Sequence, residues 1–174
     1  PATGKVGPGK QSDQAFALGF EAASAEARAK VFGGLVESLA GPDGPALTTG
    51  IFGTRMMLDE LSRGGRSDLA YALADRKTFP SWGWMLENDA TTLWEHWAGS
   101  DGTYSNNHPM FGSVSEWFFQ WLGGIQPAGD AVGFDRLVIR PQVVEGLEQV
   151  TCSHRSIRGL IESNWTAAEG EQRF

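Results

Sequence analysis

The chain up to Asp75 places hydrophobic residues at helical spacing between short breaks rich in glycine and proline. This pattern predicts four helices, because apolar residues three and four positions apart line one face of a helix. Gly41-Pro42 and Gly64-Gly65 are predicted to end the second and third helices. The short connections favour antiparallel helical hairpins. The residues expected to open the four helices are, in order, Ser12 or Asp13, Ser24, Thr48 or Thr49, and Ser67.

Helical periodicity fails between Lys77 and Gly112, which predicts a long irregular segment. Segments of this length inside a compact domain are usually functional. A further helix is predicted to follow, because Ser113 and Glu116 form the pattern of a capping box ahead of hydrophobic residues at helical spacing. Gly123-Gly124 is predicted to end this helix.

The hydrophobic pattern changes beyond Pro127. Residues 134–139, 150–154 and 157–165 are short, rich in β-branched residues and partly alternating, which predicts strands. A run of helices followed by a run of strands indicates two layers or two domains and not a βαβ sheet. We therefore predict a mainly α fold, with a helical domain over residues 1–126 and the beginning of a β-sandwich over residues 127–174.

Composition narrows the classes of partner. The net charge of −7 argues against a nucleic-acid surface, because affinity for phosphates depends on Lys and Arg. No apolar run of the length that spans a membrane occurs. Cys152 is the only cysteine, so no disulfide can form within the chain, and the compartment stays open between cytoplasm and periplasm. No phosphate loop, dinucleotide fingerprint or Gly-x-Ser-x-Gly motif is present, and no cofactor is predicted.

The residues most suggestive of chemistry lie between Phe79 and Trp121. This stretch holds six of the seven tryptophans, interleaved with carboxylates, histidines and amides. A plain hydrophobic core does not place so many polar groups beside tryptophan, because a buried polar group is costly unless it is paired. Flat aromatic rings can stack on the C–H faces of a sugar while polar groups bind its hydroxyls. The stretch therefore predicts a sugar pocket.

Glu95 is the strongest catalytic candidate. Thr92 and Glu95 fit a capping box, so one alternative is that Glu95 ties down the start of a helix. The other is that Trp94 and Trp97 flank the carboxylate in a partly dry cleft. Such surroundings raise the pKa of a carboxyl group and suit a general base near neutral pH. One side chain cannot fill both roles at once.

The two histidines of the stretch are open to several interpretations. His108 precedes Pro109, which disfavours helix at His108, and it is either an ordinary loop histidine or a positioned sugar contact. His96 adjoins Glu95, but no second His-x-x-His or Cys pair supports a metal site, and none is predicted. Glu87 and Asp89 are expected to be solvated or capping, although either could bind a hydroxyl.

Four sequence blocks, in their order and spacing, resemble bacterial α-L-rhamnosidases of glycoside hydrolase family 78. A fifth block, FDRLVIRP (134–141), resembles the passage of that family into its C-terminal β-sandwich. The resemblance covers roughly residues 11–165. The four blocks are LTTGIFGT (47–54), FPSWGW (79–84), ATTLWEHW (90–97) and NHPMFGSVSEW (107–117).

The resemblance implies part of an (α/α)6 barrel followed by a short antiparallel β segment. It also implies hydrolysis of terminal α-L-rhamnose with inversion, which needs a general acid and a general base on opposite faces of the sugar. The base of the family's Trp-Glu-x-Trp block corresponds to Glu95, and the pocket histidine of its Asn-His-x-x-Phe-Gly block corresponds to His108. The methyl corner of rhamnose suits an aromatic wall, for which the candidates are Trp82, Trp84, Trp94 and Trp97. The implied partners are rhamnose-containing glycosides.

The chain also departs from the family. The family's general acid lies in an upstream block rich in Asp, Arg and Glu, and residues 1–78 contain nothing similar. We therefore expect a C-terminal piece of an enzyme that is inactive without the rest of the chain upstream. A catalytic site within this chain would have to recruit Glu87, Asp89 or Asp101 as the acid.

Two other classes of protein remain open from the sequence. One is a non-catalytic carbohydrate-binding module, in which the aromatic cleft binds sugar and no reaction follows. The other is a helical interaction domain with an aromatic core. That second class predicts that Trp82, Trp84, Trp94 and Trp97 are all buried away from any cleft.

Overall fold

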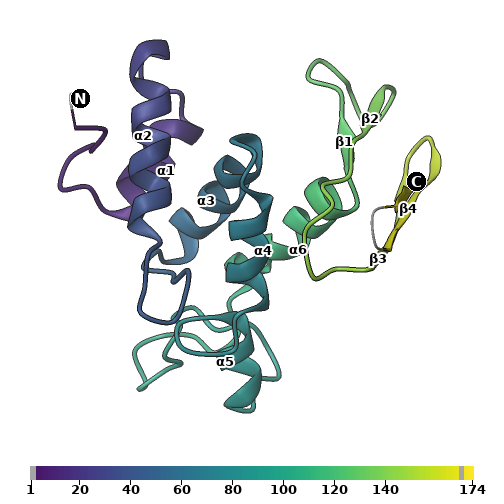
Figure 1. Ribbon diagram of the computed structural model, residues 1–174. Coiled ribbons are helices and arrows are strands. Elements are labelled where there is room, and N and C mark those ends of the chain that lie inside the picture. The colour runs from purple at the N-terminus through teal and green to yellow at the C-terminus, as the bar shows by residue number, and fades with distance from the viewer. Residues whose placement is uncertain (1–2, 169–170) are drawn as a thin grey trace. The chain divides into compact units, whose positions relative to one another are not determined.

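The computed structural model describes residues 3–168 and 171–174. The chain divides into two compact units, Pro1–Val114 and Ser115–Phe174. The first unit is helical, with α1 packed against both α2 and α3, and α3 packed against α4 (Figure 1). The helices of this unit are α1 (Gln11–Gly19), α2 (Ala25–Ser38), α3 (Ile51–Arg63), α4 (Ser67–Asp75) and the short α5 (Trp82–Glu87).

The four helices predicted before Asp75 are present, but their N-caps follow the prediction only in part. Ser24 caps α2 as expected, because its hydroxyl accepts the N–H of Ala27. Helix α1 begins earlier than expected, and Asp13 instead accepts the backbone N–H of Lys10 from the first turn. Gly50 precedes α3, where the hydroxyls of Thr49 and Thr54 bond each other at 2.8 Å.

The core of the first unit joins α1, α2 and α3 through buried aliphatic side chains and one buried amide. The Gln11 side chain donates to the carbonyl oxygens of Ser38 and Ala46, each at 2.9 Å, and accepts the N–H of Thr48 at 2.8 Å. Because an unpaired buried backbone group is costly, this amide substitutes for water at three positions of the α2–α3 connection. The connection that leads into α3 is thereby fixed. The aliphatic side chains of this core are Leu18, Val31, Leu35, Met57, Leu58 and Leu61.

The segment from Lys77 to Gly112 was predicted to be irregular throughout, and this prediction was wrong in two places. Ser81 caps α5 by accepting the N–H of Trp84 at 2.9 Å, and a 3-10 turn, η1, covers Pro109–Gly112. Both elements are too short to establish a helical period in the sequence. The rest of the segment is irregular, as expected.

The helix predicted to begin at Ser113 differs from the prediction in its start and in its geometry. Helix α6 (Ser113–Trp117) continues directly from η1, so Ser113 caps nothing, and its buried hydroxyl has no hydrogen-bond partner among the described residues. A π-helical turn, η2 (Phe118–Leu122), follows, and the N–H of Gly123 closes it on the carbonyl of Phe118 at 2.8 Å.

The second unit contains two small antiparallel sheets. One pairs β1 (Ile125–Pro127) with β2 (Leu137–Ile139), and the other has the order β3-β4-β5 with Cys152 opposite Ser163. Trp165 is buried and its indole N–H donates to the Leu122 carbonyl at 2.8 Å. The three predicted strands overlap β2, β3 and β4, but residues 134–136 and 157–158 lie outside the observed strands, and β1 and β5 were not predicted. The bounds of the second sheet are β3 (Gln149–Ser156), β4 (Gly159–Ala168) and β5 (Glu171–Arg173).

No helix in the described part of the chain has the length and apolar character needed to cross a membrane.

Candidate active site

Residues 92–108 form a hairpin-like loop that carries both Glu95 and His108. Two backbone hydrogen bonds join its arms, from the N–H of Glu95 to the Ser105 carbonyl at 2.9 Å and from the N–H of His108 to the Leu93 carbonyl at 2.8 Å. The Thr92 hydroxyl adds a bond to the Asn106 carbonyl. The two site candidates therefore lie on opposite arms of one hydrogen-bonded loop.

The Glu95 carboxylate is held by the opposite arm of this loop. Its Oε2 accepts the backbone N–H of Ser105 at 2.8 Å, and the side chain is half-buried. Residues 92–99 form no helix, so Glu95 does not serve as a helix cap and that alternative is wrong. A hydrogen bond from a backbone N–H to an ionised carboxylate is stronger than one between neutral groups. The carboxylate thus has a fixed orientation.

The tip of the loop is closed by a second contact. The rings of His96 and Tyr104 stack with centroids 4.9 Å apart and an interplanar angle of 14°. Asp101 accepts the N–H of Thr103 at 3.1 Å, which forms a tight turn at the tip. This bond and a second one from the Thr103 side chain lower the pKa of the Asp101 carboxyl group below its usual range. A general acid in a glycosidase needs the opposite shift, so the environment of Asp101 does not suit that role.

Three aromatic residues anchor the loop to α3 and η1. Trp97 is 5% exposed, stacks on Phe111 with centroids 3.7 Å apart, and meets Trp82 edge-on at 5.0 Å. The indole N–H of Trp97 donates to the Thr49 carbonyl at 2.8 Å, and that of Trp82 donates to the Phe111 carbonyl at 3.0 Å. Burial of both polar atoms is therefore compensated. The face of Trp97 presents almost no surface to a ligand in this structure.

Trp84 and Trp94 are half-buried. Trp84 packs edge-on against Phe79 with centroids 5.7 Å apart. The ring of Trp94 lies over Gly99, where a Cβ atom would come within 3.2 Å of it and where φ is +79°. A larger residue at position 99 would be strained and would displace Trp94. Trp82 is also only half-buried, so the four tryptophans are not all sequestered, as a helical interaction domain would require.

His108 combines a fixed backbone with an unused side-chain nitrogen. Its backbone is extended at the start of η1, and its N–H bonds the Leu93 carbonyl. The buried Nε2 atom has no hydrogen-bond partner among the described residues. Buried polar atoms are usually paired, so an enclosed nitrogen without a partner among the described residues is an exception to the usual pattern.

No hydrogen bond among the described residues joins Glu95 to the other acidic candidates, which are Glu87, Asp89 and Asp101. Glu87, on α5, and Asp89, which has φ of +60°, are both exposed. No group of three or more His, Cys, Asp or Glu side chains is placed to hold a metal ion within the described ranges.

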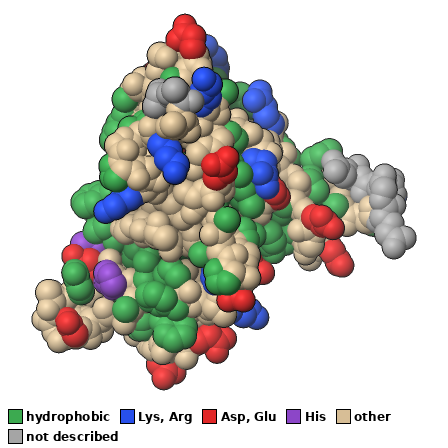
Figure 2. Space-filling model, turned by 60° about the vertical axis from the view of Figure 1, so that its left-hand side comes forward, with side chains coloured by type: hydrophobic (Ala, Val, Ile, Leu, Met, Phe, Trp, Pro, Cys, Tyr) green, Lys and Arg blue, Asp and Glu red, His purple; other side chains and the backbone are tan. Residues whose placement is uncertain are grey.

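A pocket of about 290 Å³ adjoins the loop on the side of α5. The pocket is mainly apolar. On the face of the molecule drawn in Figure 2, hydrophobic side chains gather in the lower part, beside histidine side chains. Leu93, which belongs to the hydrogen-bonded arm of the loop, forms part of the wall. The residues around the pocket are Trp82, Met85, Leu86, Ala90, Thr91, Thr92 and Leu93.

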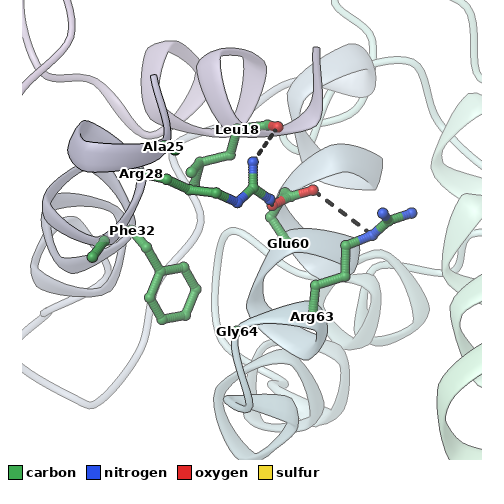
Figure 3. A pocket seen from close by; sticks show the side chains of 8 residues that line it. Leu18, Ala25, Arg28, Phe32, Glu60, Arg63 and Gly64 are labelled. Atoms are coloured by element: carbon green, nitrogen blue, oxygen red, sulfur yellow. Dashed lines mark hydrogen bonds and ion pairs between the residues drawn. The ribbon is translucent and has the colours of Figure 1, made fainter. Parts of the chain in front are cut away.

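A second pocket, of about 350 Å³, lies between α1, α2 and α3 (Figure 3). Arg28 donates to the buried Glu60 carboxylate at 2.5 Å and to the Leu18 carbonyl at 3.0 Å, and Arg63 approaches Glu60 at 3.7 Å. Figure 3 shows Glu60 between the two guanidinium groups, with the Phe32 ring on the side away from Arg63. Because Arg28 neutralises Glu60, this carboxylate is an ion-pair partner and not a group poised for proton transfer.

Sequence reasoning missed the residues that hold the candidate site in place. Ser105 and Thr49 act through backbone atoms, so their side chains carry no signal of the role. Phe111 lies within a block that resembles a known family, but its stacking on Trp97 follows only from the fold.

Comparison with known proteins identifies the family. Residues 1–122 match the family described as bacterial alpha-L-rhamnosidase 6 hairpin glycosidase domain. The chain belongs to this rhamnosidase family. Residues 124–174 match the bacterial alpha-L-rhamnosidase C-terminal domain. The resemblance drawn from the four sequence blocks is thus confirmed.

Individual rhamnosidases agree with this assignment. The chain is 35% identical over 128 residues to an alpha-L-rhamnosidase of Alteromonas sp. (strain LOR), and 34% identical over 132 residues to one of Streptomyces avermitilis. These alignments cover 69% and 71% of the chain. The chain spans only 14% and 13% of the length of these two relatives.

Solved structures of rhamnosidases share the fold. The crystal structure of a Streptomyces avermitilis alpha-L-rhamnosidase complexed with L-rhamnose matches with a TM-score of 0.89 and 30% identity, over 99% of this chain and 17% of that one. The rhamnosidase of Dictyoglumus thermophilum matches with a TM-score of 0.85 and 33% identity, over 92% of this chain and 18% of that one. The predicted mainly α, six-hairpin fold class with a short antiparallel segment is confirmed.

Proposed function

We propose that this chain is part of an inverting α-L-rhamnosidase in which Glu95 is the general base. The observation that carries the proposal is the hydrogen bond from the Ser105 N–H to the half-buried Glu95 carboxylate, within a rhamnosidase-family segment. A general base must be ionised and oriented toward one water molecule. The backbone donor fixes the orientation of one oxygen and leaves the other, Oε1, for the water.

The sugar is proposed to bind between Glu95 and the aromatic residues around it. His108 Nε2, which has no partner among the described residues, is proposed to bind a sugar hydroxyl, and the half-buried Trp84 and Trp94 are proposed to stack on the sugar. The partly exposed Trp82 is proposed to contribute the edge of its ring. Trp97 is proposed to hold the loop in place and not to touch the sugar, since its ring is covered by Phe111 and Trp82.

The general acid is proposed to come from a part of the enzyme outside these residues. The pKa of Asp101 is lowered, which is the opposite of the shift that a general acid needs. Glu87 and Asp89 are exposed, and no described hydrogen bond joins either of them to Glu95. Residues 1–174 alone are therefore proposed to be inactive. Within the enzyme, residues 1–126 are proposed to belong to the catalytic domain and residues 127–174 to a C-terminal β domain.

The proposal is tested with a full-length enzyme that contains this segment. Hydrolysis of an aryl α-L-rhamnoside is followed by proton NMR from the first turnover. Inversion predicts that β-L-rhamnose appears first and that the α anomer appears later by mutarotation. Initial formation of α-L-rhamnose would rule out an inverting mechanism. Binding of rhamnose without any hydrolysis would instead identify a carbohydrate-binding protein.

A further inference from the structure

The proposed mechanism needs a Glu95 carboxylate in a fixed position, and that position depends on Ser105, on the opposite arm of the 92–108 loop. Ser105 bonds Glu95 twice, through its carbonyl to the Glu95 N–H and through its N–H to the carboxylate. The position of the carboxylate therefore depends on the position of Ser105. The loop between them includes Gly99 and Gly102 with φ of +79° and +101°, conformations in which glycine is permissive and entropically costly to order.

Between Glu95 and Ser105 the chain is anchored to the helical core near Glu95, whereas the returning arm is next anchored at His108 and η1. Trp97 is buried and bonded to Thr49, which fixes the chain directly after Glu95 and His96. On the returning arm, Tyr104 and Ser105 are exposed. The hydrogen bonds inside the loop are local, because the N–H groups of Ala98, Gly102 and Thr103 each bond a side chain two positions earlier. Such bonds shape the turn but do not tie one arm to the other. The hydrogen bonds that join the arms begin at the Glu95–Ser105 pair and lie on the side away from the tip.

The stacked rings of His96 and Tyr104 join the two arms one position inside the Glu95–Ser105 pair. Their near-parallel contact, at 4.9 Å and 14°, connects the anchored arm to the returning arm. Tyr104 is 44% exposed, so burial in the core does not explain its position. His96 Nδ1 accepts the N–H of Ala98 at 3.3 Å, which sets the plane of the imidazole ring.

We propose that the His96–Tyr104 stack is a positioning device that holds the Ser105 N–H on the Glu95 carboxylate. The inference rests on the proposed role of Glu95 as general base. Tyr104 is a positioning residue and not a catalytic one, because it reaches the carboxylate only through Ser105. Loss of the stack releases the returning arm on the tip side of Ser105, so that the Ser105 N–H leaves the carboxylate more often and the carboxylate is less firmly directed toward water.

The test compares Tyr104→Ala with Tyr104→Phe, which keeps the stacking ring. Phe20→Ala is the matched control, because Phe20 is also exposed and also pairs with another ring, that of Phe16. Amide hydrogen exchange of Ser105 and the kcat and KM for an aryl α-L-rhamnoside are all measured in a full-length enzyme that contains this segment.

Tyr104→Ala is expected to speed exchange at Ser105 by about 2- to 10-fold, the range that aromatic pair energies imply. It is also expected to lower kcat by a similar factor with KM within about twofold, while Tyr104→Phe and Phe20→Ala leave both close to wild type. Exchange unchanged in Tyr104→Ala would overturn the proposal, as would unchanged kcat or a rise in KM alone. If the exchange follows the prediction but the wild-type enzyme does not hydrolyse rhamnosides, the positioning contact stands and the proposed function fails.

Discussion

The indole N–H of Trp97 donates a 2.8 Å hydrogen bond to the carbonyl oxygen of Thr49, a residue 48 positions earlier in the chain. Both residues are buried, and Thr49 lies just before α3. Trp97 follows the candidate base Glu95 by two residues. Its bond to Thr49 therefore attaches the loop that carries Glu95 to the start of the core helix α3. The position of this loop and the stability of the helical unit are therefore expected to depend on the same contact.

Replacing Trp97 should lower the stability of the helical unit. Trp97→Phe keeps an aromatic ring on Phe111 but leaves the buried Thr49 carbonyl without its donor. We expect a loss of about 1–3 kcal/mol in the free energy of unfolding, the cost of an unsatisfied buried polar group. Urea unfolding of residues 1–174, followed by tryptophan fluorescence at submicromolar concentration, measures the change. Trp84→Phe is the control, because Trp84 is only half-buried, and an equal loss in the two variants would contradict the assignment.

The buried amide of Gln11 should be worth more than that of its neighbour Gln14. Gln11→Leu strands two carbonyls and one N–H. Gln14→Leu strands only the N–H of Val6, and it also removes a buried Nε2 atom that has no partner among the described residues. At about 1–3 kcal/mol for each group left unpaired, Gln11→Leu should destabilise the chain by at least about 3 kcal/mol and Gln14→Leu by about 1–3 kcal/mol. Urea unfolding of the two variants side by side tests the order, and the reverse order would refute it.

The turn at the tip of the loop should depend on pH through Asp101. Hydrogen bonds from the backbone and hydroxyl of Thr103 lower the pKa of the Asp101 carboxyl in the folded chain. A lowered folded-state pKa means that the stabilisation is present above the ordinary pKa of aspartate, about 3.9, and is lost as the pH falls through the folded value. The Thr103 amide proton shift should therefore titrate with a midpoint below about 3.9. A flat profile in Asp101→Asn confirms the source, and a wild-type midpoint at or above 3.9 would exclude the bond.

Residues 1–174 in isolation are expected to self-associate. An apolar groove of about 310 Å³ lies between α1, α3 and η1, and in it Phe20 is 67% exposed and Phe52 is 65% exposed. Exposed apolar surface of this kind usually marks an interface. Light scattering after size exclusion should show oligomers that the double variant Phe20→Ser/Phe52→Ser reduces. Ile157→Ser is the control, since Ile157 is 85% exposed but lies on a turn outside the groove. A monodisperse wild-type monomer would contradict the expectation.

The sequence predicts the elements of this fold better than it predicts their contacts. The periodic helices before Asp75 and the β-branched strands after Pro127 could be recognised because their hydrophobic patterns extend over several turns or alternations. Helix α5 was missed because six residues carry too little pattern, and the capping box at Ser113 failed because η1 already supplies the preceding turn.

The candidate site shows the same limit. Glu95 and His108 could be singled out from their residue types and neighbours, and the local pattern alone suggested a helix cap at Thr92–Glu95. The structure replaces that cap with a hydrogen bond from Ser105, ten positions away. Contacts made by backbone atoms across a loop leave no signature in the residue types, so Ser105 and Thr49 could be found only in the folded chain.

The most direct test of the account is the substitution Glu95→Gln in a full-length enzyme that contains this segment. The amide keeps the size of the side chain and one acceptor oxygen for the Ser105 N–H, but it cannot take a proton from water. We expect kcat for an aryl α-L-rhamnoside to fall by at least about 100-fold, the low end of general-base contributions, while the dissociation constant for rhamnose and the melting temperature stay near wild type. A folded Glu95→Gln enzyme with kcat within about twofold of wild type would contradict the assignment of Glu95 as the general base.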